Sequence, residues 1–484
     1  MSEVLNKLYG RIGRILPKEK FARNVSILAG GTAGAQIMTV LASPLLTRLY
    51  SPADFGMLAI YISLLSLFSV IASFRYELAI PLPLKQRDAA LVVVLCLGLI
   101  GFFTLFTALL VFSCGRWISQ LLGEPRLTGY LWLLPISVLL AGTYSVFNYW
   151  ATREKRFSEV AKTRIGQALA STVIQLIGFK WGGASLIFSQ SAGQSVGVFT
   201  LGRIFFSKWN SWKISSRDIK SIATRYKRFP IYSTWEGFFN TVGAQLPPLL
   251  FGAFFSPVAA GLYSLANRVL SLPMSLIGSA IGQVFFANAA QANREGRLGI
   301  LVAQFHTKLA HIGMAPAIFL VLLGPDLFAL VFGEKWRQAG EFARWMSPWL
   351  YLVFVSSPLS TLVAVIEQQK QGLIFQSLLL LARILAISLG VILGDTTTAV
   401  MLFSGASSMS YIGFLFWIGR ATNIRASTMI KPSVHALLIA LVCAMPLLFS
   451  IFLFHEQPYA WIYGLIFSIV IFGMRLVHLL RAAY

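Results

Sequence analysis

The sequence predicts an all-α polytopic membrane protein, and two observations support this fold class. Of the 484 residues, 57% are hydrophobic and only 12% are charged. The apolar residues form runs of about 20, which is the helix length that spans the hydrocarbon core of a bilayer. Short polar loops separate these runs and leave no room for a soluble domain of useful size. We therefore expect about 14 transmembrane helices, arranged as two parallel-repeat six-helix lobes followed by a C-terminal helical pair.

The apolar runs define the predicted spans, which follow one another along the chain. They cover residues 24–47, 56–80, 90–113, 130–151, 162–179, 183–202, 230–253, 262–286, 301–323, 345–366, 372–393, 398–419, 434–454 and 458–477. A twelve-span alternative would omit two helices, most easily the fifth and the sixth. Both alternatives leave the two ends of the chain on the same side of the membrane.

The basic residues lie mostly in alternate loops, and this pattern predicts the orientation. The chain has 40 lysines and arginines against 17 acids, a formal charge of +23. Of the 40 cations, 30 fall in loops or toward span ends on the side of the N-terminus, 7 fall on the opposite side and 3 lie deeper inside spans. Because positively charged loops stay in the cytoplasm, we expect both termini to be cytoplasmic. Orientation thus explains the high charge, and we expect no nucleic-acid partner.

These features divide the chain into five segments. They are a basic amphipathic N-terminus at 1–23, a first lobe at 24–203, a basic inter-lobe loop at 204–228, a second lobe at 229–419 and a C-terminal pair at 434–477. The N-terminus and the loop both combine cations with apolar side chains, as interfacial helices do. We expect them to lie on anionic membrane lipids. A frayed basic tail remains the alternative for the N-terminus.

A short motif occurs once in each lobe. S-P-A-D-F-G at 51–56 is matched by S-P-V-A-A-G at 256–261, 205 residues later. Each copy follows a span that contains proline, Pro44 in the first lobe and Pro247-Pro248 in the second. An even number of spans separates the copies, so the lobes are predicted to be related by an axis along the membrane normal. Prolines inside helices weaken the backbone hydrogen bonding, and we expect these three to act as hinges.

Motifs of hydrolase or transferase chemistry are absent from the sequence. It contains no glycine-rich phosphate loop, HExxH site, CxxC pair or G-x-S-x-G elbow. The three cysteines are too few and too scattered for a metal site or a disulfide framework. The five histidines are expected to be buried and satisfied, or interfacial. We therefore predict a protein that is not an enzyme, without a metal or a cofactor.

The charges inside the predicted spans are the best candidates for function. They are Arg75, Glu77, Arg268, Arg383 and, early in the seventh span, Glu236. A charge at the bilayer centre costs at least about 2.5 kcal/mol, so it should face protein or water. Arginine grips phosphate bidentately and stays charged at every accessible pH, which favours a phosphate or pyrophosphate ligand. Snorkelling to the headgroups is the alternative for Arg75 and Glu77.

Two stretches resemble a known family. T-R-L-Y-S-P-A-D-F-G at 47–56 and R-Y-E-L-A-I-P-L-P at 75–83 resemble the N-terminal signature of bacterial polysaccharide (O-antigen type) flippases. These belong to the multidrug/oligosaccharidyl-lipid/polysaccharide exporter superfamily. A-N-R-V-L-S-L-P at 266–273 is similar to the eighth-helix pattern of lipid II flippases, in which the matching arginine lies in the central cavity. The resemblance thus supports Arg268 as a ligand-binding residue.

The resemblance implies a flippase of the bacterial inner membrane that moves an undecaprenyl-pyrophosphate-linked oligosaccharide by alternating access. Arg268, Arg75, Arg383 and Arg48 are the expected pyrophosphate contacts, and Glu77 and Glu236 are the expected coupling or gating groups. An ion gradient or the membrane potential would drive transport, and other membrane proteins of polysaccharide assembly are expected partners. A multidrug or lipid II exporter of the same superfamily, and a membrane-bound polymerase or ligase, remain alternatives.

Overall fold

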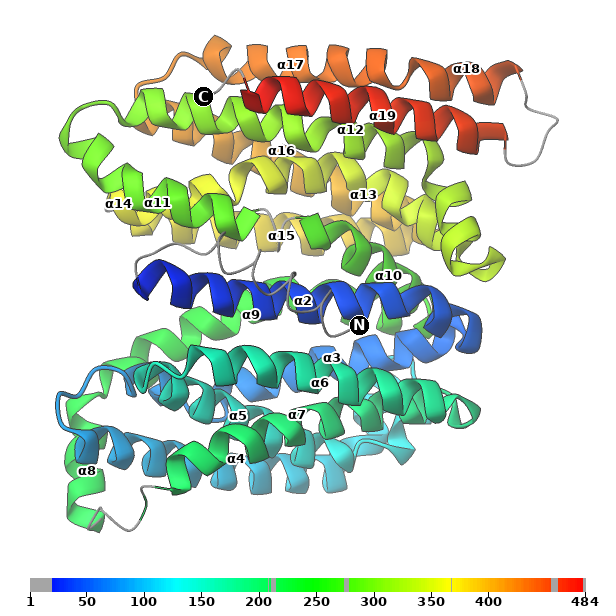
Figure 1. The fold of residues 1–484 in the computed structure, drawn as a ribbon. Coiled ribbons are helices and arrows are strands. Elements are labelled where there is room, and N and C mark those ends of the chain that lie inside the picture. Colours follow the sequence, from blue (N-terminus) through cyan, green and yellow to red (C-terminus); the bar gives the residue numbers. More distant parts are fainter. Residues whose placement is uncertain are drawn as a thin grey trace, which may run out of the picture. The chain divides into compact units, whose positions relative to one another are not determined.

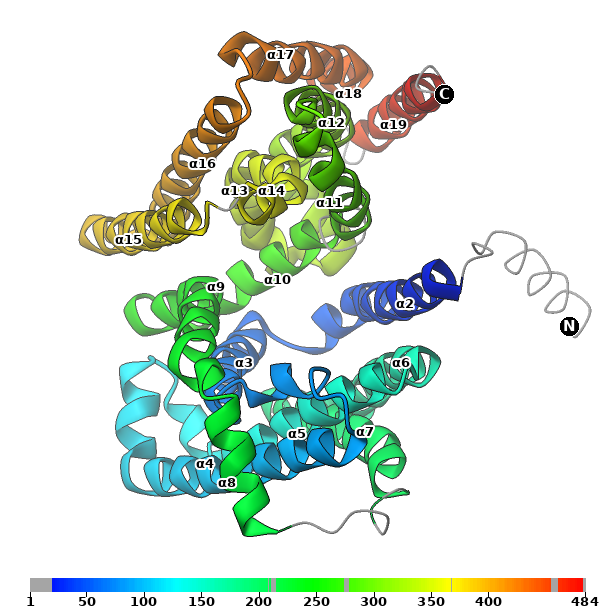
Figure 2. The same ribbon diagram turned by 90° about the vertical axis from the view of Figure 1, so that its left-hand side faces the viewer.

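A computed structural model describes residues 20–207, 209, 215–273, 278–366, 368–453 and 460–481. These residues form helices and no strand, so the all-α prediction is confirmed. Figures 1 and 2 show the helices in two views. The chain divides into two compact units, the first ending at Gly261 and the second beginning at Leu262. The division falls inside helix α10 (Pro257–Pro273).

The first unit is built around α3, whose residues from Phe55 to Leu65 are almost all buried. Helix α3 packs against α5, α7 and α9, while α2 packs on α6 and α4 on α5. The elements are α2 (Lys20–Leu49), α3 (Pro52–Ile71), η1 (Tyr76–Ala79), α4 (Gln86–Leu121), η2 (Pro125–Gly129), α5 (Leu133–Arg153), α6 (Phe157–Ile177), η3 (Phe179–Trp181), α7 (Gly183–Phe206), α8 (Ser216–Arg225), η5 (Phe229–Ser233) and α9 (Thr234–Phe254). Several well-separated segments therefore bury one central helix.

Loops of the first unit gather at two opposite ends, as an alternating membrane topology requires. At one end the Arg126 guanidinium donates to the Ala53 carbonyl at 3.3 Å. At the other end the Arg153 guanidinium donates to the Pro81 carbonyl at 3.0 Å. The basic inter-lobe segment lies at this second end, where α8 packs beside α4 (Figure 1).

The second unit is organised by α12, the longest of its helices, which contacts α11, α13, α17 and α19. Helices α13 and α15 both pack on α16, and α18 packs on α19. The elements after α10 are α11 (Ser279–Arg294), α12 (Leu298–Phe332), η7 (Glu334–Trp336), α13 (Arg337–Ser356), η8 (Pro358–Thr361), α14 (Leu362–Val365), α15 (Gln369–Leu393), α16 (Thr396–Ala421), α17 (Ala426–Cys443), α18 (Met445–Leu453) and α19 (Ala460–Arg481). The C-terminal helices are thus packed onto α12.

Each predicted span overlaps a helix, but not every boundary is as predicted. The described residues include six helices that are long and apolar enough to cross a membrane: Pro52–Ile71, Gln86–Leu121, Leu298–Phe332, Lys370–Leu393, Thr396–Ala421 and Ala426–Cys443. The count of fourteen crossings stays a prediction. The predicted eighth span at 262–286 overlaps α10, which is described to Pro273, and α11, which begins at Ser279. Residues 274–277 lie outside the described residues, so the continuity of this span stays a prediction.

The contact division differs from the predicted lobes, because α9 packs on α3 and so groups with the first unit. The repeat-based lobe boundaries at 24–203 and 229–419 stay a prediction. The predicted N-terminal interfacial helix lies almost entirely outside the described residues, since these begin at residue 20.

Candidate functional site

The first copy of the repeated motif, at 51–56, forms a turn that we call the first proline-glycine turn. Its side chains connect three loops of the first unit. Ser51 caps α3 by accepting from the Asp54 backbone N–H at 3.2 Å, and the Asp54 carboxylate accepts from the Ser51 N–H at 3.1 Å. The same carboxylate accepts from the Gly183 N–H at 3.2 Å and lies 3.6 Å from the Arg126 guanidinium. Two hydrogen bonds to Glu124 hold Arg126 and raise its pKa. Asp54 therefore has a structural role.

The second proline-glycine turn, at 256–261, has the same serine cap and contacts the first turn. Ser256 accepts from the Ala259 N–H at 3.1 Å, so the serine cap occurs in both copies. A Cβ added to Gly56 would lie 1.7 Å from the Pro257 carbonyl oxygen, and one added to Gly261 would lie 2.0 Å from the Pro52 carbonyl oxygen. The two backbones thus approach each other reciprocally, at a distance that only glycine allows. All of these residues belong to the first unit.

Arg75 and Glu77 lie beyond the end of α3, so the prediction that they fall inside a helical span is wrong. Helix α3 ends at Ile71, and Phe74 and Arg75 follow with φ values of 48° and 59°. This left-handed backbone stops the helix, since non-glycine residues adopt it only at a cost. The chain then forms η1, which includes Glu77. The pair therefore occupies a turn.

This turn compensates its own charges. Glu77 is buried, accepts a hydrogen bond from the Ser73 hydroxyl and lies 3.7 Å from the Arg75 guanidinium. Arg75 is also packed on α9, because a Cβ added to Gly237 would lie 3.2 Å from its Nε atom. Nearby, the Tyr76 hydroxyl donates to the Ala223 carbonyl of α8 at 3.0 Å. The turn thus ties α8 and α9 to the end of α3.

Glu236, the other predicted coupling residue, is exposed in the first turn of α9. It directly precedes Gly237, on which Arg75 packs, so the predicted gating residues come from adjacent segments of the first unit. Arg48 is exposed in the last turn of α2, three residues before Ser51. It therefore belongs to the opposite end of the unit from Arg75, because Ser51 and Arg75 flank the length of α3.

The predicted hinge prolines all lie within helices that continue through them. Pro44 is inside α2, and Pro247 and Pro248 are buried inside α9. The Thr47 hydroxyl donates to the Pro44 carbonyl at 3.1 Å and so supports the backbone there. Whether the prolines act as hinges stays a prediction.

Arg383 is held by side chains of its own unit. Its guanidinium lies over the rings of Trp349 and Phe403, at 5.2 and 5.3 Å from their centroids. Its Nε donates to the Ser407 hydroxyl at 3.1 Å. These contacts join α15 to α13 and α16. Cation–π contacts and a hydrogen bond can account for an arginine at this position without a ligand.

Arg268 differs from the other arginines. It is half-buried on α10, two turns beyond the second proline-glycine turn. Its guanidinium has no hydrogen bond or ion pair with any residue in the described part of the chain. A guanidinium presents five donors in a rigid fork, so it is costly to leave these unpaired in an apolar region. Arg268 is therefore the embedded cation that can best accept an anionic ligand.

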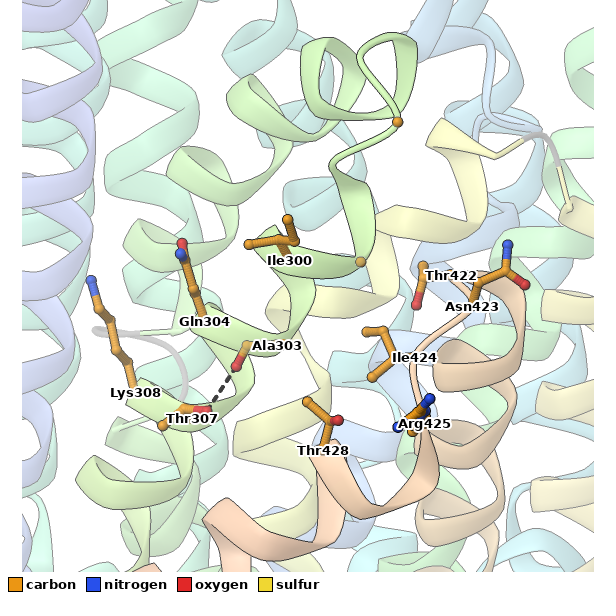
Figure 3. A pocket seen from close by; sticks show the side chains of 12 residues that line it. Ile300, Ala303, Gln304, Thr307, Lys308, Thr422, Asn423, Ile424, Arg425 and Thr428 are labelled. Carbon is orange, nitrogen blue, oxygen red and sulfur yellow. Dashed lines mark hydrogen bonds between the residues drawn. The ribbon is translucent and has the colours of Figure 1, made fainter.

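A cavity of about 770 Å³ in the second unit was not predicted from the sequence (Figure 3). It lies between the start of α12 and the turn that connects α16 to α17. Thr307 and Lys308 of α12 face Thr428 and Arg425 across it. The twelve lining residues include two cations and no acid. The only signal in the sequence was the location of both cations near the predicted cytoplasmic ends of spans.

Comparison with protein families decides the membership of this chain. A family profile described as "Polysaccharide biosynthesis protein" matches residues 45–341, more than half of the 484 residues. The chain belongs to this family. The matched region contains Arg48, Arg75 and Arg268 and ends before Arg383.

Several bacterial proteins of polysaccharide biosynthesis are similar to this chain. The succinoglycan biosynthesis transport protein ExoT of Rhizobium meliloti (strain 1021) is 22% identical over 431 residues, which cover 85% of this chain and 83% of ExoT. The teichuronic acid biosynthesis protein TuaB of Bacillus subtilis (strain 168) is 25% identical over 213 residues, 43% of each chain. The amylovoran biosynthesis protein AmsL of Erwinia amylovora is 21% identical over 272 residues, 55% of this chain and 68% of AmsL.

Solved structures show which fold this polysaccharide biosynthesis protein has. The lipid II flippase MurJ in an inward closed conformation matches with a TM-score of 0.74 and 11% identity, over 94% of this chain and 99% of MurJ. An inward-facing MATE multidrug transporter of the MOP superfamily matches with a TM-score of 0.57 and 13% identity, over 82% and 94% of the two chains. These likenesses show the fold, and the chain has a multi-pass membrane fold like that of MurJ and the MATE transporter. The predicted resemblance to a polysaccharide family is confirmed by the family profile.

Proposed function

We propose that this protein is a flippase that moves an undecaprenyl-pyrophosphate-linked oligosaccharide, an O-antigen or other surface polysaccharide repeat unit, from the cytoplasmic to the periplasmic leaflet of the bacterial inner membrane. Family membership and the exporter fold support a transport role in polysaccharide biosynthesis. ExoT is named as a transport protein and MurJ as a lipid II flippase, which favours transport over a polymerase or ligase.

The observation that carries the proposal is that Arg268 pairs with no side chain among the residues that the structure describes. The other two embedded arginines already have partners in their own units, Glu77 for Arg75 and two aromatic rings for Arg383. Arg268 has neither an ion pair nor a hydrogen bond with the described residues, whereas the charge of Arg75 is balanced by Glu77. A pyrophosphate provides oxygen acceptors that match the planar fork. We therefore assign Arg268 the principal contact with the pyrophosphate.

The other residues take supporting roles in this proposal. Glu77 and Arg75 close the end of the first unit that we place in the cytoplasm, and Glu236 lies on the adjoining segment. Pro44, Pro247 and Pro248 would allow α2 and α9 to bend as the site alternates between the two sides of the membrane. An ion gradient or the membrane potential would set the direction.

The test is complementation of a strain that lacks this protein, scored by surface polysaccharide at equal protein level. Arg268→Ala should lower the yield at least about tenfold, since a hydrogen bond to a charged group contributes about 1.5–3 kcal/mol and 1.4 kcal/mol is a factor of ten. Arg268→Lys should recover part of the yield, because it restores the charge without the fork. Arg116→Ala, which changes an exposed arginine of α4, is the matched control. A normal yield from Arg268→Ala would refute the assignment.

A further inference from the structure

Three histidines of the second unit lie along the seam where α12 packs on α17, and one of them is distant from the other two in the sequence. His306 and His311 belong to α12 and His435 belongs to α17, two helices in contact. The His306 Nε2 atom lies 2.8 Å from the Met429 carbonyl oxygen. The His311 and His435 rings lie edge to face, with centroids 5.4 Å apart. Two α12–α17 contacts thus involve imidazoles.

The hydrogen bonding of His306 leaves one nitrogen able to take a proton. A backbone carbonyl only accepts, so Nε2 carries the hydrogen and donates it to Met429. The lone pair of the neutral ring is then on Nδ1, which is buried and has no hydrogen-bond partner among the described residues. The side chain as a whole is only 2% exposed. An unpartnered basic nitrogen in an apolar seam is costly, and function commonly explains such groups.

The cavity described above lies next to the contact between His306 and Met429. Thr307 and Thr428, which line the cavity, are the sequence neighbours of His306 and Met429 (Figure 3). The Ser433 hydroxyl lies 3.3 Å from the His306 Nε2 atom and receives a hydrogen bond from Tyr351 of α13 at 3.4 Å. Polar groups therefore extend from the cavity along the seam.

The His311–His435 pair lies about one and a half turns farther along α12. Around it the seam is apolar, with a cluster of buried residues that comprises Ala310, Met314, Ala315, Ala436 and Ala440. Arg475 of α19 is the charged group within electrostatic reach of the pair, and Cys443 of α17 is a titratable neighbour of Arg475. Within the described residues no carboxylate pairs with these groups, and on α12 the nearest other charge is Lys308 at the cavity.

We propose that His306, His311 and His435 form a proton-binding site where α12 packs on α17, and that this site couples the proposed transport to a proton gradient. A hydronium ion gives its proton to the lone pair of one of these imidazoles, leaving water and an imidazolium. This inference rests on the proposed function.

Protonation changes the energy of the seam. It places a positive charge 5.4 Å from a second imidazole and within reach of Arg475, in surroundings without a compensating acid. Like charges in a low-dielectric region repel strongly. The protonated state therefore weakens the contact of α17 and α19 with α12, and the neutral state restores it. This gives the C-terminal helices a role in the transport cycle.

The direct test is titration of the imidazoles by NMR, with the full chain carrying ¹³C-labelled histidine in lipid nanodiscs between pH 5 and 8. The His311 signal should titrate in this range, and His435→Gln should move its midpoint upward, since one repelling charge is removed. Met314→Leu, a volume-conserving change in the same seam, should leave the midpoint in place. A His311 midpoint that His435→Gln does not move would overturn the site.

A second arm measures coupling in cells that depend on this protein for surface polysaccharide. Nigericin, which collapses the proton gradient, should lower the wild-type yield at least about threefold. The His311→Gln and His435→Gln double variant should give a low yield that nigericin no longer changes. If the double variant behaves as wild type while Arg268→Ala abolishes the yield, the coupling inference fails and the proposed function stands. If Arg268→Ala also has no effect, the proposed function fails.

Discussion

The Arg75 turn and the Arg268 helix each contain an arginine near the membrane, but their surroundings differ. Arg75 lies 3.7 Å from a buried carboxylate, on a left-handed backbone that ends its helix. Arg268 lies within the regular helix α10 and pairs with no acid among the described residues. The partners of a cation therefore indicate better than its depth in an apolar run whether the cation can bind a ligand. The charge of Arg75 is already balanced by Glu77, whereas no acid among the described residues balances that of Arg268.

The largest effect on stability is expected for Arg75→Ala. This change leaves the Glu77 carboxylate buried without its partner, and breaking a buried ion pair costs about 3 kcal/mol. Thermal unfolding of the purified protein should show the loss as a lower melting temperature. Adding Glu77→Gln should restore most of the stability, because a neutral amide no longer needs the cation. No recovery in the double variant would show that Arg75 has a role besides neutralising Glu77.

A smaller loss of stability, about 2 kcal/mol, is expected for Arg383→Ala. The substitution removes two cation–π contacts and the hydrogen bond to Ser407. Arg383→Lys keeps the charge over the rings and should recover about half. The melting temperature measures both. If Arg383→Ala left the melting temperature unchanged and abolished transport, Arg383 would act on the substrate. Its contacts with the rings would then not explain its presence.

The smallest effect, about 1 kcal/mol, is expected for Asp54→Asn. The carboxylate completes the cap of α3 and faces the half-exposed Arg126, interactions that each contribute about 1 kcal/mol or less. Denaturation should detect the loss, with transport maintained at equal protein level. Ala259 occupies the corresponding position of the second turn, so this turn forms without a carboxylate. Loss of transport from a fully stable variant would give Asp54 a functional role instead.

Much of the architecture could be predicted, because the hydropathy of a helix depends on residues that are close together in the sequence. Runs of apolar residues identified the helices, and the serine, proline and glycine at 51–56 and 256–261 identified a repeated motif. The reciprocal contact of Gly56 with Pro257 and of Gly261 with Pro52 explains why both turns end in glycine. A sequence states which residues a turn needs but does not state that the two turns touch.

The features that could not be predicted depend on local backbone strain or on distant contacts. The apolar run continues through Arg75, so hydropathy gave no sign that Phe74 and Arg75 take a left-handed backbone that ends the helix. His306 and His435 are 129 residues apart, and only the packing of α12 on α17 brings their helix faces together. For the same reason the histidines looked isolated in the sequence.

The most direct test of the central claim is the binding of undecaprenyl pyrophosphate to the purified protein in nanodiscs. The unpaired guanidinium predicts that Arg268→Ala binds this lipid at least about tenfold more weakly than wild type. The Arg75→Ala, Glu77→Gln double variant, which removes a pair that is already compensated, should bind within about twofold of wild type. Equal affinity in wild type and Arg268→Ala, with a loss in the double variant, would contradict the claim and assign the pyrophosphate to the Arg75 turn.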